Sequence, residues 1–425
     1  MTSAENRSPK RDASRGPLAG VRILDLTSVV LGPLATQILG DYGADVIKVE
    51  TLDGDLMRAN GVSLHPGMSS IFLAINRNKR SLAVNLKTPE GGEILRRLIP
   101  GTDVLVHNMR VSAIEKLGFG YAAVSAQNPG IVYCVATGFD QSGPDRDKPA
   151  FDDIIQAACG LAGLNGITFG TPDYAPTLVA DKTTGMAVVN AVLAALFHRE
   201  RCGHGQYVEV PMYETMVAFM LAEHLGGLTF DPPPVGAGYA RLLTGGRKPA
   251  PTLDGHIGIL PYTADHWIAF FTMAGREDLA EKYGVRDKQA RNAHMVDMYR
   301  DMGEIIRKRS TAEWVEICTR LDIPVTPIYA LDDLPAHPQL KASGLFQTAE
   351  HPSEGTIRYV APPTKFSATP AGVSRQAPIL GSHTQEILAE AGYAREEIAS
   401  LAARRIVVQS AGQAPATERS TPPVT

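Results

Sequence analysis

Asp181 is the residue of this sequence best suited to act as a nucleophile. It stands in the segment VADKTTGMAVV, just before the apolar run Met186–Phe197, which is typical of a buried helix. A carboxylate needs no base, because an ordinary aspartate has a pKa of about 3.9. The same position suits a helix cap, where free backbone N–H groups and the helix dipole favour the ionised form. From the residues alone, the cap is favoured over the nucleophile.

A second group of residues that could take part in binding or chemistry is basic. Cations near strand ends and helix starts of an α/β domain suit a phosphate-bearing ligand. A solvated basic edge explains them equally well, so both interpretations stay open. The cations concerned are Arg77, Lys79, Arg80 and Lys87 in NRNKRSLAVNLK, followed by Arg110 and Lys116.

Several familiar motifs are missing. The first expected strand-to-helix turn has the sequence LGPLATQILG and lacks GxGxxG, which argues against a nicotinamide cofactor. No serine stands in a GxSxG context. The cysteines form no CxxC pair and have no histidine at ligand spacing, so we expect neither disulfides nor a metal site. They are Cys134, Cys159, Cys202 and Cys318.

The elements that must position these residues alternate between strand and helix patterns. Val21–Thr27 and Ala44–Glu50 are strand-like and flank helical spacing at Leu34–Leu39, which predicts a βαβ unit and a parallel sheet. Further strands are expected at Asp103–His107 and Ile131–Thr137, and Thr88-Pro89 should begin a helix. The pattern predicts a doubly wound, Rossmann-like α/β domain over residues 17–212.

A change in the sequence pattern after Tyr213 predicts a second, smaller domain. Residues 213–246 are rich in proline and glycine and are interpreted as a linker. Residues 247–330 resemble an α+β unit with a strand at His256–Leu260, and the chain beyond is loop-rich until a helix at Gln385–Ala391. Helices are expected around His266–Met273, Met295–Lys308 and Thr311–Leu321. Residues 1–16 and 406–425 have the composition of disordered tails.

Composition excludes some classes of partner. A formal charge of −4 over 425 residues does not support nucleic-acid binding. The polar N-terminus has no apolar core of a secretory signal, and Met186–Phe197 is too short to cross a bilayer. We therefore expect a cytoplasmic protein with no membrane or nucleic-acid partner.

From Gly16 to about Leu401 the sequence resembles the class III CoA-transferase family, which includes formyl-CoA and carnitine CoA-transferases and the α-methylacyl-CoA racemases. The motifs that carry the resemblance are PLAGVRILDLT, GADVIKVE, NRNKRSLAVNLKTPEG, KPAFDDIIQAACGL, VADKTTGMAVVNAVLAALFHRERCGHGQYVEV and APILGSHTQEIL. The resemblance implies a large domain to which residues 331–405 return, and an interlocked homodimer.

The resemblance also implies roles for individual residues. Asp181 falls on the position of the family's catalytic aspartate, which forms covalent acyl and CoA intermediates. With the resemblance, the role of nucleophile is therefore favoured over the role of helix cap. CoA enters as a substrate, with no tightly bound cofactor. Asn108 and Arg110 match a CoA-contacting stretch, although the local sequence NMRVS departs from the family's Asn-Phe-Arg-Pro-Gly. Val30 replaces a glutamine found near the thioester in some transferases. The other implied CoA contacts are Val84, Asn85, Leu86, Lys87 and Lys116.

The racemase branch shares the fold and the aspartate, so other residues must decide. Racemisation needs two acid–base groups at one carbon. The family's racemases carry Gly-His-Asp where this chain has Ala150-Phe151-Asp152, and their supporting glutamate is missing from Ala250–Gly255. Both differences favour a transferase, and Asp152 matches an acidic position near the thioester. A racemase or a catalytically silent CoA-binding protein are the alternatives. Arg241 and Arg247 could grip a dicarboxylate, although exposed arginines are commoner.

Overall fold

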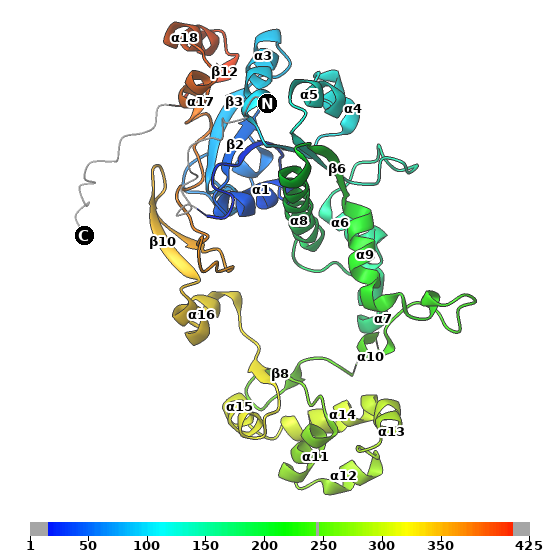
Figure 1. Ribbon diagram of the computed structural model, residues 1–425. Coiled ribbons are helices and arrows are strands. Elements are labelled where there is room, and N and C mark those ends of the chain that lie inside the picture. Colours follow the sequence, from blue (N-terminus) through cyan, green and yellow to red (C-terminus); the bar gives the residue numbers. More distant parts are fainter. Residues whose placement is uncertain (1–15, 244–245, 411–425) are drawn as a thin grey trace, which may run out of the picture. The chain divides into compact units, whose positions relative to one another are not determined.

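A computed structural model of the chain describes residues 16–243 and 246–410, which form two compact units (Figure 1). The first unit contains the chain up to Cys159, Ala175–Phe219 and the residues from Lys341 onward. The second unit contains Gly160–Tyr174 and Met220–Leu340. Residues 160–174 therefore group with the second unit, although the sequence pattern assigns them to the large domain. The expected tails at 1–15 and 411–425 lie outside the described residues.

The first unit is built on a seven-stranded sheet in the order β12-β3-β2-β1-β4-β5-β6. All neighbours are parallel except β12, which runs antiparallel to β3. The strands are β1 (Arg22–Leu26), β2 (Asp45–Glu50), β3 (Lys79–Val84), β4 (Val104–His107), β5 (Val132–Thr137), β6 (Gln206–Pro211) and β12 (Val407–Val408). This confirms the α/β class with a mainly parallel sheet that the alternating patterns predict.

Helices cover both faces of this sheet. One face packs its Leu, Ile and Val side chains against α3, α4, α5, α17 and α18, forming the main core of the unit. The other face packs against α1 and α8. The helices are α1 (Leu31–Asp41), α2 (Ser70–Ile75), α3 (Pro89–Leu98), α4 (Val111–Lys116), α5 (Tyr121–Gln127), α6 (Asp152–Ala158), α8 (Val179–Cys202), α9 (Met212–His224), α17 (Thr384–Glu390) and α18 (Arg395–Ala403). As predicted, Thr88 caps α3, its side chain accepting a hydrogen bond from the Gly91 N–H.

Two expectations about the first unit are wrong. Residues 406–410 do not belong to a disordered tail, because Ile406 and Val407 are buried and β12 closes the sheet beside β3. The basic stretch around residue 80, for which a phosphate site and a solvated basic edge were both open, is neither of these at Arg77, Lys79 and Arg80. It forms β3, which is buried along its whole length, and its cations are neutralised by ion pairs of Arg77 with Asp41, Lys79 with Asp25, and Arg80 with Asp45.

The second unit is mainly helical around an aromatic core. Trp267, Phe270 and Trp314 are fully buried in it, and the Phe270 and Trp314 rings stack. Its elements are α7 (Leu161–Phe169), α10 (Ala240–Leu243), β7 (Ala250–Pro251), β8 (His256–Ile259), α11 (Ala264–Met273), α12 (Glu277–Lys282), α13 (Lys288–Ala293), α14 (Met295–Ile306), α15 (Thr311–Arg320), β9 (Val325–Pro327) and the 3₁₀ helices η4 (Gly226–Thr229) and η5 (Leu331–Ala336). The predicted linker 213–246 thus contains most of α9, all of α10 and η4.

The chain that follows the second unit is more ordered than its composition indicates. After α16 (Pro338–Ser343), the strands β10 (Phe346–His351) and β11 (Gly355–Val360) form an antiparallel hairpin in the first unit. The alternation of this hairpin is obscured by polar residues on both of its faces. For that reason, the sequence predicts only loops there.

Candidate active site

The strand order of the sheet reverses between β1 and β4, which defines where a ligand can enter. From β1 the chain continues outward through β2 and β3 on one side, and β4, β5 and β6 follow on the other. In open α/β sheets, ligands bind in the crevice outside the carboxyl ends of the strands at such a reversal. A cavity of about 400 Å³ lies there. We call it the crevice.

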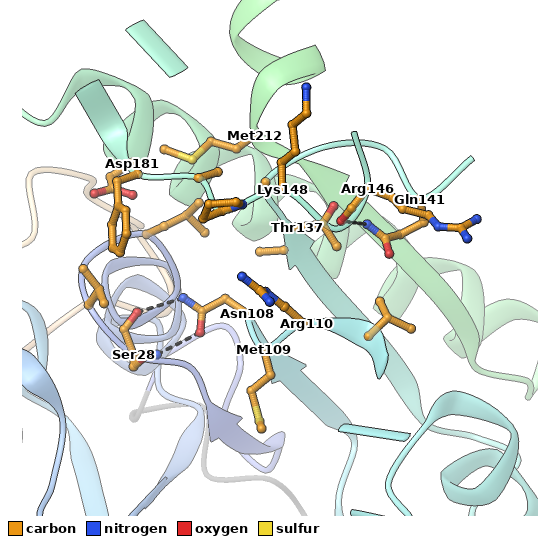
Figure 2. A pocket seen from close by; sticks show the side chains of 18 of the residues that line it. Ser28, Asn108, Met109, Arg110, Thr137, Gln141, Arg146, Lys148, Asp181 and Met212 are labelled. Atoms are coloured by element: carbon orange, nitrogen blue, oxygen red, sulfur yellow. Dashed lines mark hydrogen bonds between the residues drawn. The ribbon is translucent and has the colours of Figure 1, made fainter. Parts of the chain in front are cut away.

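The crevice is lined by the segments that follow β1, β4 and β5 and by the start of α8. In Figure 2, Asp181 and Arg146 lie on opposite sides of it, with Arg110 and Lys148 between them. The lining residues are Ser28, Val29, Leu31, Leu56, Asn108, Met109, Arg110, Val111, Ala136, Thr137, Gly138, Gln141, Arg146, Lys148, Pro149, Ala150, Phe151, Asp181 and Met212. The structure thus brings together four residues singled out from the sequence: Asn108, Arg110, Phe151 and Asp181.

Asn108 ties two sides of the crevice together. Its Oδ1 accepts a hydrogen bond from the Ser28 N–H at 3.0 Å, and its Nδ2 donates to the Ser28 carbonyl at 2.8 Å (Figure 2). This reciprocal pair joins the turn after β1 to the end of β4. Asn108 therefore has a structural task at the site in addition to its predicted contact with CoA.

Asp181 is the third residue of α8 rather than its cap. The helix begins at Val179, and the N-terminal position before it is held by Leu178 without a side-chain hydrogen bond. The apolar run from Met186 marks only the interior of this longer helix, so the sequence places the helix start too late. Within the described residues, the Asp181 carboxylate accepts no hydrogen bond, although it lines the crevice. A partly buried carboxylate without partners is available to react with a ligand.

Asp152 holds the backbone of Asp181 in place through a hydrogen bond. Asp152 begins α6 and is buried, and its Oδ2 accepts a hydrogen bond from the Asp181 backbone N–H at 2.9 Å. Its Oδ1 accepts from Gln156 Nε2 at 2.6 Å, while Gln156 Oε1 accepts from the Ala175 N–H at 2.8 Å. These bonds fix the start of α8 against α6. Asp152 itself does not line the crevice.

The electrostatics of Asp181 differ from the sequence expectation. Burial and the neighbouring charge of Asp152 raise the pKa of Asp181 to about 7. The prediction that helix cap and dipole keep this carboxylate ionised is therefore wrong, because the desolvation of a carboxylate and a like charge beside it outweigh both effects. Perturbed carboxylates of this kind are typical of functional sites.

Gly185 allows α8 to approach α1 closely one turn after Asp181. A Cβ atom at Gly185 would lie 2.8 Å from the Leu31 carbonyl oxygen, closer than real Cβ atoms come to backbone. Leu31 is the first residue of α1 and lines the crevice. The close packing of the two helices therefore sets the position of Asp181 relative to the crevice wall at Leu31.

Two crevice cations were missed by the sequence reasoning. Arg146 and Lys148 stand in SGPDRDKPA, the loop that follows β5, and both side chains are largely exposed. Among the residues that the structure describes, they make only local ion pairs, with Asp147 and Asp145 respectively. The signal was present: loops at the carboxyl ends of parallel strands line the ligand site in such folds.

The remaining predicted residues lie outside the crevice lining. Val30 precedes α1 with its side chain buried against Met57, Met68 and Phe72, so its neighbours Val29 and Leu31 form the wall instead. Val84 is buried in the main core and paired with β12, which leaves its side chain no ligand-facing surface. Lys87 and Lys116 are exposed, while Asn85 and Leu86 are half-buried. Arg241 and Arg247 belong to the second unit.

A metal centre is not indicated. Across the described part of the chain, no three His, Cys, Asp or Glu side chains are grouped to hold a metal ion.

Comparison with known proteins points to one family. The model of CoA-transferase family III matches residues 18–384. A succinate–glutarate CoA-transferase of Agrobacterium fabrum is 33% identical over 397 residues, which covers 92% of this chain and 98% of that protein. A formyl-CoA:oxalate CoA-transferase of Escherichia coli O157:H7 is 31% identical over 408 residues, which covers 91% and 98% of the two chains.

Solved structures share the fold. A CAIB/BAIF family protein from Brucella suis superposes with a TM-score of 0.76 at 28% identity, over 89% of this chain and 100% of its own. A protein of Mycobacterium tuberculosis gives a TM-score of 0.77 at 28% identity, over 88% and 99% of the chains.

Proposed function

The chain belongs to CoA-transferase family III and is a CoA-transferase of the CaiB/BaiF type; from this premise we propose that it transfers CoA between carboxylic acids through a covalent intermediate on Asp181. The observation that carries the proposal is the carboxylate of Asp181, which faces the crevice without a hydrogen-bond partner among the described residues. A carboxylate nucleophile must be accessible in this way, because a hydrogen bond to each oxygen would lower its reactivity.

The proposed reaction consists of two reversible exchanges. The Asp181 carboxylate attacks the thioester carbonyl of the donor and expels CoA thiolate, which leaves a mixed anhydride. The thiolate then attacks the Asp181 carbonyl and releases the donor acid, so that Asp181 becomes a CoA thioester. An incoming carboxylate attacks this thioester and displaces the thiolate again. Attack of the thiolate on the acyl carbonyl yields the new acyl-CoA and restores Asp181. Backbone N–H groups beside Asp181 would stabilise the transient oxyanions.

The identity of residue 151 favours this transfer over racemisation. Phe151 lines the crevice where the family's racemases carry a histidine, and a phenylalanine cannot move a proton. None of the described residues that line the crevice is a histidine or a glutamate. We therefore expect isotope label to exchange between a free acid and an acyl-CoA. Deuterium exchange at the α-carbon without a carboxylate acceptor would instead support the racemase.

The charge distribution of the crevice favours one orientation of the substrate. Phosphate groups of CoA would lie toward Arg110, Arg146 and Lys148, and the thioester toward Asp181 (Figure 2). The relatives are named for succinate, glutarate and oxalate, which are small dicarboxylic acids. Isotope exchange measured with each of these acids in turn would therefore show which donor and acceptor acids this chain uses.

Removal of one crevice cation should weaken CoA binding. Charged hydrogen bonds contribute about 1.5–3 kcal/mol, so Arg110→Met should raise the KM for acyl-CoA roughly tenfold or more, with a smaller effect on kcat. The control is Arg395→Met, because Arg395 is exposed on α18 and does not line the crevice. Steady-state kinetics with varied acyl-CoA would check this. An unchanged KM for Arg110→Met would mean that the phosphates bind elsewhere.

We further propose that the chain forms a homodimer, as the family resemblance implies. Met186 and Phe197 of α8 are 53% and 65% exposed, and Phe219 of α9 is 55% exposed. α8 is long and apolar enough to cross a membrane by length and composition, yet half of its apolar window is buried in the protein. A second copy would cover its exposed apolar side chains. Light scattering should give twice the chain mass of 45.5 kDa; a monomer at micromolar concentration contradicts the proposal.

The predicted cytoplasmic location can be tested by cell fractionation.

A further inference from the structure

The turn after β1 has an unfavourable backbone conformation. Val29 lines the crevice with φ at +71°, in the left-handed region. A β-branched residue rarely adopts this conformation, because its side chain crowds the backbone. Such strain persists only where surrounding contacts enforce it, and it concentrates at functional sites.

A buried ion pair supplies those contacts. Asp55 Oδ1 accepts a hydrogen bond from the Val29 N–H at 3.2 Å, and Asp55 Oδ2 pairs with Lys48 Nζ at 2.9 Å. Lys48 Nζ also donates to the Thr27 carbonyl at 3.1 Å. The two side chains therefore bind the backbone of the turn on either side of Ser28.

Asp55 also shapes a second part of the crevice wall. Its Oδ1 accepts from the Met57 N–H at 2.9 Å and so caps the short helix η2 (Leu56–Arg58). Leu56, which follows Asp55 directly, lines the crevice. One carboxylate thus fixes two neighbouring segments of the crevice wall, at Val29 and at Leu56.

Stability alone is a poor explanation for this pair. The side chains of Lys48 and Asp55 are 0% and 1% exposed. Burying two charges costs nearly as much as their attraction returns, and well-packed apolar replacements are often as stable. A buried pair that also holds a strained turn is better explained by the geometry that it imposes.

We propose that Lys48 and Asp55 are positioning residues for CoA transfer, which hold the Thr27–Val29 turn so that the crevice wall faces the thioester bound at Asp181. This proposal rests on the proposed function. Misplacing a site wall by about 1 Å can cost on the order of a hundredfold in rate. Losing the pair should therefore lower kcat more than it raises KM.

Two double variants separate the effect of the hydrogen bond to the Val29 N–H from the effect of the buried charges. Lys48→Met/Asp55→Asn removes the ion pair but keeps an oxygen that can accept from the Val29 N–H. Lys48→Met/Asp55→Leu removes both. We expect the asparagine variant, which loses the Lys48 bond to the Thr27 carbonyl, to lower kcat by about 3–10-fold, and the leucine variant, which also loses the bond to the Val29 N–H, by about 30–100-fold, with a smaller change in the KM for acyl-CoA. If the leucine variant does not fold, Lys48→Met/Asp55→Ala takes its place.

A matched control is the buried pair of Arg77 and Asp41. It has similar burial, at 8% and 3% exposure, and Asp41 ends α1 at the opposite end from the crevice. Arg77→Met/Asp41→Leu should leave kcat within about threefold even where it lowers the melting temperature. Equal losses of kcat in the control and the leucine variant would overturn the proposal, as would a leucine variant with unchanged kcat.

Crystal structures of the double variants test the positioning role of the ion pair independently of the proposed reaction. We expect Val29 to leave the left-handed region in the leucine variant and to stay there in the asparagine variant. Retention of a positive φ in the leucine variant overturns the proposal whatever the activity. If the unmodified chain transfers no CoA, the proposed function fails, while the conformation of Val29 still reports on the ion pair.

Discussion

Replacing Asp181 by alanine should lower CoA transfer by at least roughly a thousandfold, because no covalent intermediate can form without the carboxylate. Folding should change little. The side chain makes no hydrogen bond with the described residues, and alanine is a good helix former at the third position of α8. Exchange of label between an acyl-CoA and a free acid measures the loss, and calorimetric CoA binding and thermal unfolding show that the site survives.

The neighbouring acid Asp153 provides the control. It is exposed on α6 next to Asp152 and does not line the crevice, so Asp153→Ala should retain activity within about threefold. In the unmodified enzyme, hydroxylamine should convert the Asp181 thioester into a hydroxamate that mass spectrometry locates. An acceptor labelled with heavy oxygen should leave one labelled oxygen on Asp181. Persistent turnover in Asp181→Ala, or trapping on a different peptide, contradicts the mechanism.

Four of the seven strands of the sheet could be predicted from the sequence because they are apolar. β1, β2, β4 and β5 appear within one or two residues of their predicted ranges, since strands buried on both faces produce continuous hydrophobic runs. β3 was missed for the opposite reason. Its first residues are Lys79 and Arg80, and their burial depends on acidic partners far away in the sequence. A pattern within one segment cannot reveal such a partner.

The sequence predicted that Asp181 belongs to the candidate site, and the structure places it in the crevice lining, but its electrostatic environment could not be predicted. Motif context predicted Asp181 as the candidate nucleophile, and the strand reversal explains why Asn108 and Arg110 lie in the same crevice. The environment of Asp181 depends on Asp152, which lies 29 residues earlier and meets it only through the fold. Desolvation likewise has no counterpart in the sequence. For this reason the ionisation of Asp181 was predicted in the wrong direction.

The activity of the enzyme should depend on pH through Asp181. Its pKa is raised to about 7, and only the deprotonated form can attack a thioester, so kcat/KM should rise with pH and reach half of its plateau near pH 7. Below that pH, each unit should lower kcat/KM roughly tenfold, since the ionised fraction falls by that factor. A profile of kcat/KM from about pH 5 to 9, with acid-stable substrates, tests this; a flat profile would mean that Asp181 is ionised throughout.

Asp152→Asn identifies the cause of this shift. Loss of the Asp152 charge should lower the pKa of Asp181, so the rising limb of the profile should move to lower pH. The substitution also replaces a carboxylate that accepts from the Gln156 amide by a side chain with only one acceptor oxygen. The plateau should therefore fall by about 3–10-fold through poorer orientation of α8. Gln156→Glu would add a like charge near Asp152 and serves as the opposite perturbation.

The midpoint of the profile, rather than its height, distinguishes the two causes of the raised pKa. A mere change of plateau in Asp152→Asn, with the midpoint still near pH 7, would leave burial as the sole cause. A midpoint at lower pH would assign to Asp152 a direct part in setting when the nucleophile is charged. Asp152 would then act on the reaction twice, because its charge tunes Asp181 while its hydrogen bond to the Asp181 N–H holds the start of α8.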